Sequence, residues 1–187
     1  MDDTGIVAAL HSGNFAAIEE LSRAYGNRLL RSAYLLCGNE PDSQDLVQDT
    51  WIQVIKSIHR FRGDSSLYSW IYGILLNLSR HYHRARKRLQ LDHDLDSHPA
   101  STVQAETNHL DMEMASSILM NALRQLSPPH REIIVLRYYE GMKVEAIARR
   151  LGVSTGTVKS RLHYATKCLR AIIPEHLNLF GSQGTYI

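Results

Sequence analysis

The segment Lys143–Arg170, KVEAIARRLGVSTGTVKSRLHYATKCLR, decides the fold of the C-terminal half of the chain. Its first half has small and apolar residues at helical spacing, which predicts the buried face of a short helix; they are Val144, Ile147, Ala148 and Leu151. Gly152 is predicted to end this helix in a left-handed conformation, and Ser154 to cap the next helix. The second helix has apolar residues at Val158, Leu162, Ala165 and Leu169. Two short helices joined this tightly predict a helix-turn-helix.

The opposite side of the second predicted helix is polar and basic, with Thr155, Gly156, Lys159, Ser160 and His163. In a DNA-binding helix-turn-helix the second helix lies in the major groove, while hydroxyl, amide and cationic groups contact phosphates. The pattern therefore predicts a DNA-binding surface. The alternative is a plain helical hairpin with a solvated polar face. Small Ala148, turn residue Gly152 and apolar Val158, placed where two helices cross closely, favour the helix-turn-helix.

Charge is segregated along the chain, although the formal net charge is only +2. Residues 80–88 carry a net charge of +5, residues 89–115 carry −6, and residues 116–170 carry +7. Two basic segments around an acidic one suggest two polyanion-binding surfaces, joined by a connector that does not itself bind phosphates. The connector contains Pro99 and scattered Ser and Thr with little periodicity, which indicates a flexible acidic linker.

Hydrophobic periodicity predicts further helices at about 15–37, 42–58, 66–88, 112–126 and 129–139. The expected fold is all-α, with two small helical domains, since 187 residues with 44% hydrophobic content can fill two small cores. The longest uncharged apolar stretch, residues 70–78, is too short to cross a bilayer, and the acidic start MDDTGIVAAL is unlike a secretory signal. Cys37 and Cys168 form no CxxC pattern. A cytoplasmic protein without disulfides, membrane insertion or cofactors is expected.

Two of the predicted helices are amphipathic in a way that bears on function. Helix 42–58 carries Asp42, Asp45 and Asp49 along one side, which on spacing alone is a solvated face that favours the helix N-terminus. Helix 66–88 is predicted to bury Leu67, Ile71, Ile74, Leu78, Tyr82 and Ala85. Its outer face becomes basic toward the C-terminal end. The aromatic residues nearby are either core residues or stacking platforms for unpaired bases; they are Tyr68, Trp70, Tyr72 and Tyr82.

Four parts of the chain resemble, in order, the extracytoplasmic-function (ECF) family of bacterial RNA polymerase sigma factors. Asp45–Trp51, DLVQDTW, resembles the DLVQETF segment of region 2, and Phe61–Gly63 resembles its FRG turn. Trp70–Tyr72 and Asn77–Leu78 resemble the WLY and NL positions. The region 4 motifs are matched by LSPPHRE at 126–132, LRY at 136–138 and GTVKSRLH at 156–163. The resemblance covers nearly the whole chain.

This resemblance implies a sigma factor that binds core RNA polymerase, directs it to specific promoters and assists DNA opening, without being an enzyme. It implies region 2 in residues 1–88, a linker in 89–115, region 4 in 116–173 and a C-terminal tail in 174–187. The implied partners are the beta-prime and beta subunits of core polymerase, promoter DNA and an anti-sigma factor.

The resemblance also assigns residues to three surfaces. Those expected to bind polymerase are Asp45, Gln48, Asp49 and Trp51. Those expected at the minus 10 element, where melted bases leave the stack, are Arg62, Asp64, Ser65, Trp70, Asn77, Arg80 and Arg84. Those expected at the minus 35 element are Ser154, Thr155, Gly156, Thr157, Lys159, Ser160, Arg161 and His163.

Two alternative functions have less support. An autonomous helix-turn-helix regulator would explain Lys143–Arg170, but not the acidic stripe of helix 42–58, the FRG turn or the basic end of helix 66–88. A metal-dependent phosphodiesterase would use the His- and Asp-rich segment, which comprises His81, His83, His93, Asp94, His98 and His109. Most of these residues fall in the predicted linker and no HExxH pair occurs, so no metal ligand and no catalytic residue is predicted.

Overall fold

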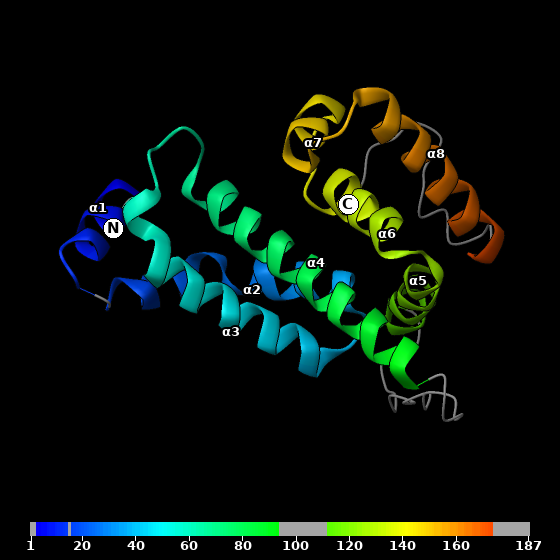
Figure 1. The fold of residues 1–187 in the computed structure, drawn as a ribbon, viewed down its shortest axis with the longest axis horizontal. Coiled ribbons are helices and arrows are strands. Elements are labelled where there is room, and N and C mark those ends of the chain that lie inside the picture. The colour runs from blue at the N-terminus through cyan, green and yellow to red at the C-terminus, as the bar shows by residue number, and fades with distance from the viewer. Residues whose placement is uncertain (1–2, 15, 94–111, 174–187) are drawn as a thin grey trace. The chain divides into compact units, whose positions relative to one another are not determined.

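The computed structural model describes residues 3–14, 16–93 and 112–173, which form helices joined by short turns (Figure 1). The chain divides into two compact units, residues 1–85 (unit 1) and 86–187 (unit 2), with the boundary inside helix α4. The described residues contain no strand, and the predicted all-α class is confirmed. Most of the predicted linker, residues 94–111, and the predicted tail, residues 174–187, lie outside the described residues.

Unit 1 contains α1 (Asp3–His11), α2 (Ala17–Cys37), α3 (Glu40–Ser57), the 3₁₀ turn η1 (Ile58–Arg60) and most of α4 (Leu67–His93). Helices α2 and α3 pack side by side and are joined by a tight turn at Gly38 (Figure 1). Gly38 has a φ of 86°, which favours glycine, and its N–H donates to the Tyr34 carbonyl oxygen at 2.8 Å. Asn39 then caps α3, because its side-chain oxygen accepts from the Asp42 backbone N–H at 3.0 Å.

Helix α4 lies against both α2 and α3. The His83 Nε2–H donates to the Leu36 carbonyl oxygen of α2 at 3.1 Å, and the Tyr82 hydroxyl donates to the Asp42 carboxylate of α3. Because α4 faces two helices, its buried residues cover a wider part of its circumference than contact with one helix would require. They are Leu67, Ile71, Tyr72, Leu75, Leu76 and Ser79. The predicted buried face was therefore partly wrong, since Ile74 and Leu78 are only half-buried and Ala85 is exposed.

Two features of unit 1 differ from the sequence analysis. Helix α4 continues to His93, past the predicted end at Arg88, because no proline or glycine interrupts it there and Leu, Gln, Lys and Arg favour helix. Helix α1 was not predicted. Only Ile6 and Leu10 of α1 are buried, and a single apolar pair gives too short a pattern to predict a helix.

Unit 2 contains α5 (Met112–Gln125), α6 (Pro128–Ile134), the π-helical turn η2 (Val135–Tyr139), α7 (Val144–Leu151) and α8 (Thr155–Ile172). Helix α8 packs against α5, α6 and α7. The side chains buried between these helices are Leu123, Ile133, Leu136, Ile147, Val158, Ala165 and Leu169. The helix predicted at 129–139 thus begins at Pro128 and widens into a π-helical turn at Val135.

Candidate nucleic-acid interface

The turn between α7 and α8 has the geometry that the sequence predicted. Gly152 ends α7 with a φ of 66°, and the Val153 N–H donates to the Ala148 carbonyl oxygen at 3.1 Å. Ser154 then caps α8, because its Oγ accepts from the Thr157 backbone N–H at 3.0 Å. The structure confirms these two helices and the turn between them as a helix-turn-helix.

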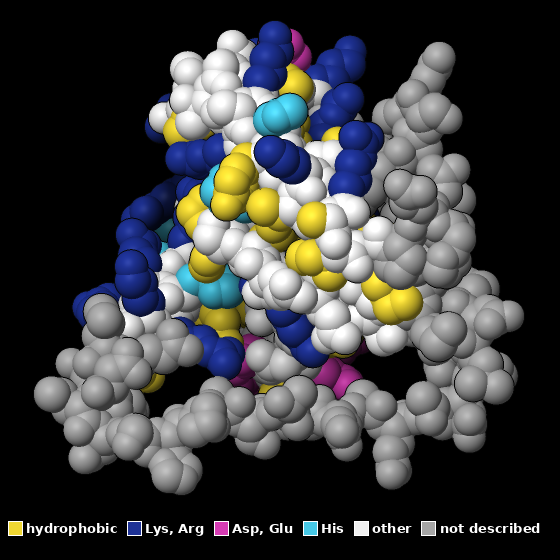
Figure 2. All heavy atoms as spheres, turned by 90° about the vertical axis from the view of Figure 1, so that its right-hand side faces the viewer, with side chains coloured by type: hydrophobic (Ala, Val, Ile, Leu, Met, Phe, Trp, Pro, Cys, Tyr) yellow, Lys and Arg dark blue, Asp and Glu magenta, His cyan; other side chains and the backbone are white. Residues whose placement is uncertain are grey.

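We call the exposed residues of the first turns of α8 the recognition surface; they are Thr155, Gly156, Lys159, Ser160 and His163. Three other residues predicted at the minus 35 element are placed differently. Ser154 and Thr157 bond each other through their hydroxyls at 2.9 Å, and Arg161 is half-buried. Figure 2 shows Lys and Arg side chains gathered at the top of that view, where the helix-turn-helix lies. Such a surface attracts phosphate.

Arg131 positions the helices beneath the recognition surface. Its side chain is buried, and its Nε–H donates to the Leu123 carbonyl oxygen at 2.8 Å. Its Nη2 donates to the carbonyl oxygens of Arg124 at 3.0 Å and Leu126 at 3.3 Å. The last carbonyl groups of a helix lack partners within that helix, so Arg131 caps α5 from α6. Since α5 and α6 both pack on α8, these hydrogen bonds fix the two helices that support α8.

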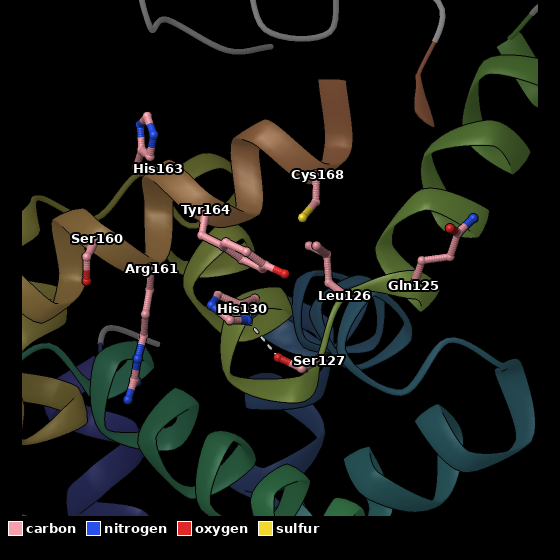
Figure 3. Close-up of a pocket in the computed structure, with 9 residues that line it drawn as sticks. All are labelled: Gln125, Leu126, Ser127, His130, Ser160, Arg161, His163, Tyr164 and Cys168. Carbon is pink, nitrogen blue, oxygen red and sulfur yellow. Dashed lines mark hydrogen bonds between the residues drawn. The ribbon is translucent and has the colours of Figure 1, made fainter. Parts of the chain in front are cut away.

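An open hollow of about 680 Å³ lies beside the recognition surface, between the α5–α6 turn and α8 (Figure 3). The Tyr164 ring, 56% exposed, lies against the His130 ring with 4.7 Å between centroids. The Ser127 hydroxyl bonds His130 Nδ1 at 2.7 Å. Burial, and then the positive charge of Arg161, lower the pKa of His130 from its usual 6.5. Leu126 and Cys168 are also in its lining, so the hollow offers ring and aliphatic surface beside its polar groups.

Four of the residues predicted at the minus 10 element lie in or beside the loop 61–66, which joins η1 to α4, and the other three lie further along α4. Arg62, Asp64 and Ser65 lie in this loop and are exposed. The Trp70 ring packs against the Phe61 ring, with centroids 5.5 Å apart and planes tilted by 57°. Phe61 was not assigned to the site from the sequence; the FRG motif was the only signal for it.

Helix α4 extends this surface along one side. Trp70, Asn77 and Arg84 recur every seven residues, and Arg80 lies between them at helical spacing. Asn77 and Arg84 are exposed, while Trp70 and Arg80 are half-buried. A ring, an amide and cations on one helix face are groups that can stack with bases and contact a strand backbone.

The acidic stripe of α3 divides into two parts. Asp45, Gln48 and Asp49 are exposed on one face, with Trp51 half-buried beside them. Asp42 accepts from Tyr82 and from the Asn39 side chain, so it joins α3 to α4 instead. The exposed part is an acidic surface suited to a basic partner.

The described residues give no support to a metal site. They contain no group of three or more His, Cys, Asp or Glu side chains that could hold a metal ion. His83 is bonded to the Leu36 carbonyl oxygen, and Asp94, His98 and His109 lie outside the described residues. Of the helices described, none combines the length and the apolar character that crossing a bilayer requires.

Comparison with known proteins agrees with this geometry. Residues 21–89 match the family model Sigma-70 region 2, and residues 122–171 match Sigma-70, region 4. The chain is 34% identical to the RNA polymerase sigma-E factor of Streptomyces avermitilis over 162 residues, or 84% of this chain and 86% of that protein. The chain belongs to the ECF family of RNA polymerase sigma factors. Members of this family are not enzymes.

Other relatives and solved structures extend the similarity. The ECF RNA polymerase sigma factor SigE of Mycolicibacterium smegmatis is 34% identical over 178 residues, and the match covers 94% of this sigma factor but 66% of that protein. The sigma factor RpoE of Bartonella quintana, solved with the anti-sigma factor NepR, has a TM-score of 0.66 at 28% identity, covering 82% of this chain and 94% of that one. CnrH, solved with the cytosolic domain of CnrY, has a TM-score of 0.63 at 27% identity, covering 90% and 95%. These similarities favour a sigma factor over the autonomous regulator.

Proposed function

We propose that this sigma factor binds core RNA polymerase through α3, captures melted minus 10 bases with the loop 61–66 and α4, and reads the minus 35 element with α8. The observation that carries the proposal is that two sigma region models match in order, and that each matched region presents exposed side chains of the chemistry its task needs. The protein directs core polymerase to promoters and assists their opening, so its partners are core polymerase and promoter DNA.

The polymerase-binding role of α3 is supported by exposure and charge. Asp45, Gln48 and Asp49 stand on one exposed face, while the opposite face is buried through Leu46, Thr50 and Val54. The fold therefore does not need these carboxylates for its own packing. A basic surface on the beta-prime subunit would be complementary to them, and complementary charge gives an interface both specificity and a fast association rate.

The minus 10 role follows from the energy of melting. Extruding a base from a duplex costs a few kcal/mol, which stacking and hydrogen bonds to the protein must offset. Trp70 with Phe61 provides ring surface, Asp64, Ser65 and Asn77 provide hydrogen-bonding groups, and Arg62, Arg80 and Arg84 provide cations for phosphates. The polar members of this set that stand in the loop are exposed, as direct contact requires.

The minus 35 role rests on the recognition surface. Lys159 contacts phosphate or a guanine edge, and the Thr155, Ser160 and His163 side chains are short enough to follow base edges in the groove. Gly156 leaves room for close approach of the helix N-terminus, whose N–H groups favour phosphate. Ser154 and Thr157 support the site as its cap, and Arg161 stands at its edge.

The same proposal covers the organisation of the chain. Region 2 occupies residues 1–88, an acidic linker 89–115, region 4 116–173 and a tail 174–187, and the two ends of the linker belong to α4 and α5. The protein works in the cytoplasm, where core polymerase is. An anti-sigma factor regulates it, since RpoE and CnrH, both similar to this chain, were each solved with a second protein.

Run-off transcription with purified core polymerase on a genomic promoter library tests the proposal. Specific transcripts that depend on this protein support it, and their absence contradicts it. The double variant Asp45→Lys with Asp49→Lys should weaken core binding at least about 10-fold, because like charges would then oppose a basic partner. The matched control is Glu19→Lys with Glu145→Lys, which makes the same change in net charge at exposed positions outside α3. If both double variants weaken binding equally, α3 does not provide the docking surface.

A further inference from the structure

Helix α1 contacts the structure just before the loop 61–66. It packs on η1, and the His11 Nε2–H donates to the Ile58 carbonyl oxygen at 3.0 Å. The same carbonyl oxygen accepts from the Phe61 N–H at 2.9 Å. The Ile58 carbonyl oxygen thus accepts from both the first residue of the loop and a side chain of α1. Phe61, which it positions, is the residue whose ring supports Trp70.

Helix α1 also connects to the structure just after the loop. The Tyr25 hydroxyl of α2 donates to Asp3 Oδ1 at 2.7 Å. Burial, then the hydrogen bond to Asp3 and its charge, raise the pKa of Tyr25 to about 12, so the phenol keeps its proton and donates at physiological pH. The Tyr25 ring packs on the Tyr68 ring with centroids 5.2 Å apart, and Tyr68 stands in the first turn of α4.

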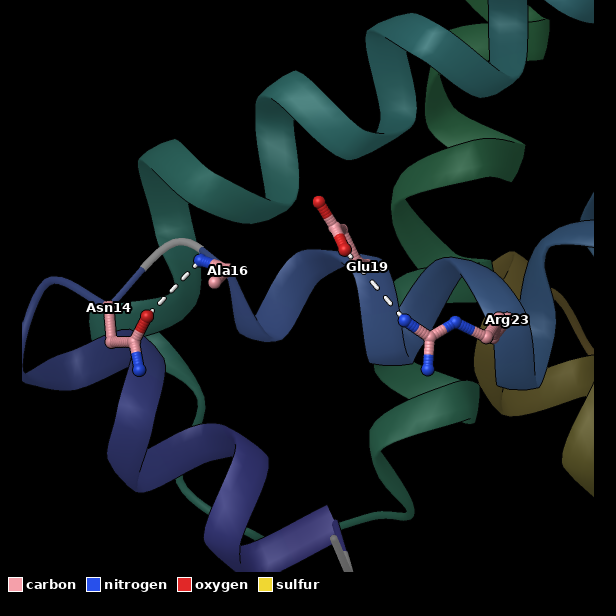
Figure 4. A network of polar contacts seen from close by, with 4 residues as sticks. All are labelled: Asn14, Ala16, Glu19 and Arg23. Carbon is pink, nitrogen blue, oxygen red and sulfur yellow. Dashed lines mark hydrogen bonds and ion pairs between the residues drawn. The ribbon is translucent and has the colours of Figure 1, made fainter.

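The two contacts stand at opposite ends of α1, and the middle of the helix is fixed independently. Ile6 and Leu10 are each 3% exposed, so apolar packing alone attaches α1 to the unit. The turn into α2 is closed by its own bonds, from the Asn14 N–H to the Ala9 carbonyl oxygen at 2.9 Å and from the Ala16 N–H to Asn14 Oδ1 at 3.3 Å (Figure 4). The polar groups of His11 and Asp3 are therefore not needed to attach the helix. What they add is one hydrogen bond to η1 and one to Tyr25, whose ring packs on the first turn of α4.

We infer that α1 is a clamp for the loop 61–66, with His11 as the positioning residue on its η1 side and Asp3, through Tyr25, on its α4 side. The clamp sets the loop in the shape that captures minus 10 bases, so both residues influence which bases are accepted without touching DNA. This inference rests on the minus 10 role proposed above. It applies the general requirement that a binding constellation be held by supporting residues on rigid elements.

The test uses His11→Ala, which removes the clamp bond, and Tyr25→Phe, which removes the hydroxyl but keeps the ring on Tyr68. His11→Gln retains an N–H donor of similar reach and should behave nearly as the wild type. Ser12→Ala is the matched control, because the Ser12 hydroxyl donates only within its own helix end, to the Ala9 carbonyl oxygen at 2.8 Å. Circular dichroism of each full-length variant should show unchanged helicity.

The first measurement is hydrogen exchange of the free protein by mass spectrometry. In His11→Ala, amides of residues 59–66 should exchange about 2- to 10-fold faster, the range expected for loss of one hydrogen bond. In Tyr25→Phe the increase should fall on residues 66–70 instead. The second measurement uses the holoenzyme on a template library randomised over the minus 10 element. His11→Ala should reduce base discrimination there by about 2- to 10-fold while leaving the minus 35 preference and core affinity unchanged.

Unchanged exchange of residues 59–66 in His11→Ala overturns the clamp. Arg62→Ala and Asp64→Ala test whether the loop itself sets the preference for minus 10 bases. If either variant alters that preference, but His11→Ala exchanges faster and leaves it unchanged, the clamp does not influence DNA recognition. If neither of these loop variants alters it, the proposed minus 10 role of the loop is wrong, and the clamp's effect on promoter choice falls with it. Equal effects of His11→Ala and Ser12→Ala mean that fraying of α1, rather than the bond to Ile58, is responsible.

Discussion

Replacing Arg131 with Met should destabilise unit 2 selectively. The variant keeps an apolar stem of similar length in the buried site but loses the three hydrogen bonds to the carbonyl oxygens of Leu123, Arg124 and Leu126. Hydrogen bonds from a charged group contribute about 1.5–3 kcal/mol each, and the bond at 3.3 Å is the weakest of the three. Two strong bonds, with their carbonyl groups left partly unsatisfied, give an expected loss of about 3–5 kcal/mol.

This loss is large relative to the total stability of unit 2. About 70 described residues at about 0.05–0.15 kcal/mol each correspond to about 3.5–10 kcal/mol. Arg131→Lys keeps the charge but cannot form the fork, and we expect a loss of about 1.5–3 kcal/mol. Arg124→Met is the matched control, because the Arg124 side chain is exposed on the surface of α5, where its Nη1–H donates to Asn121 Oδ1 at 3.3 Å; the expected effect of such a surface change is within about 0.5 kcal/mol.

The assay can separate the two units because both tryptophans, Trp51 and Trp70, belong to unit 1. Urea unfolding followed by tryptophan fluorescence should have the same midpoint in wild type, Arg131→Met and Arg124→Met. Hydrogen exchange of residues 122–173 should show the loss in Arg131→Met alone. The reasoning is refuted if Arg131→Met destabilises unit 2 by no more than Arg124→Met does.

Three further predictions concern unit 2. Ser154→Ala should lower the stability of unit 2 by about 1 kcal/mol through loss of the cap, and Ser154→Asp, which can still cap, should not; hydrogen exchange at the start of α8 measures both. Because the pKa of His130 is lowered in the folded state, the unfolded state binds its proton first, so unit 2 should lose stability as pH falls through 6.5. His130→Gln should remove part of that loss in unfolding experiments at pH values on either side of 6.5, and an identical pH dependence would show that His130 is not responsible. If Lys159 contacts phosphate, Lys159→Ala should weaken holoenzyme binding about equally on all promoters. It should also reduce the slope of log binding constant against log salt concentration by about one unit. Thr155→Ala should instead change the base preference at one position of the minus 35 element, by about 1–3 kcal/mol. An unchanged preference in Thr155→Ala would remove Thr155 from the reading residues.

Local patterns predicted most of the helices because their signals lie within a few residues. Gly152 marks the turn of the helix-turn-helix because glycine adopts a positive φ readily, and Ser154 marks it because a serine side chain can cap a helix. Each of these properties belongs to a single residue. The exposed side of α8 followed directly from the spacing of Val158, Ala165 and Leu169.

Contacts between distant residues could not be predicted in the same way. The buried side of α4 depends on its lying against two helices, and a run of apolar residues from Trp70 to Leu76 does not select one face. Arg131 and His11 both donate hydrogen bonds to backbone carbonyl oxygens. Every residue has such an oxygen, so the sequence does not indicate which residue accepts the bond. The assignment of Asp42 to a surface stripe was also wrong because of a contact between distant residues. The hydroxyl of Tyr82, forty residues away, donates a hydrogen bond to the Asp42 carboxylate.

The central claim is that sequence-specific promoter binding and DNA opening require both this chain and core polymerase. Permanganate footprinting on a promoter found by run-off transcription, with a gel shift of the same fragment, each with and without core polymerase, tests it most directly. The chain alone should bind the duplex weakly and in a strongly salt-dependent way, and reactive thymines near minus 10 should appear only when both proteins are present. Tight, sequence-specific duplex binding by the chain alone, with no reactive thymines when polymerase is added, would contradict the claim and favour an autonomous regulator.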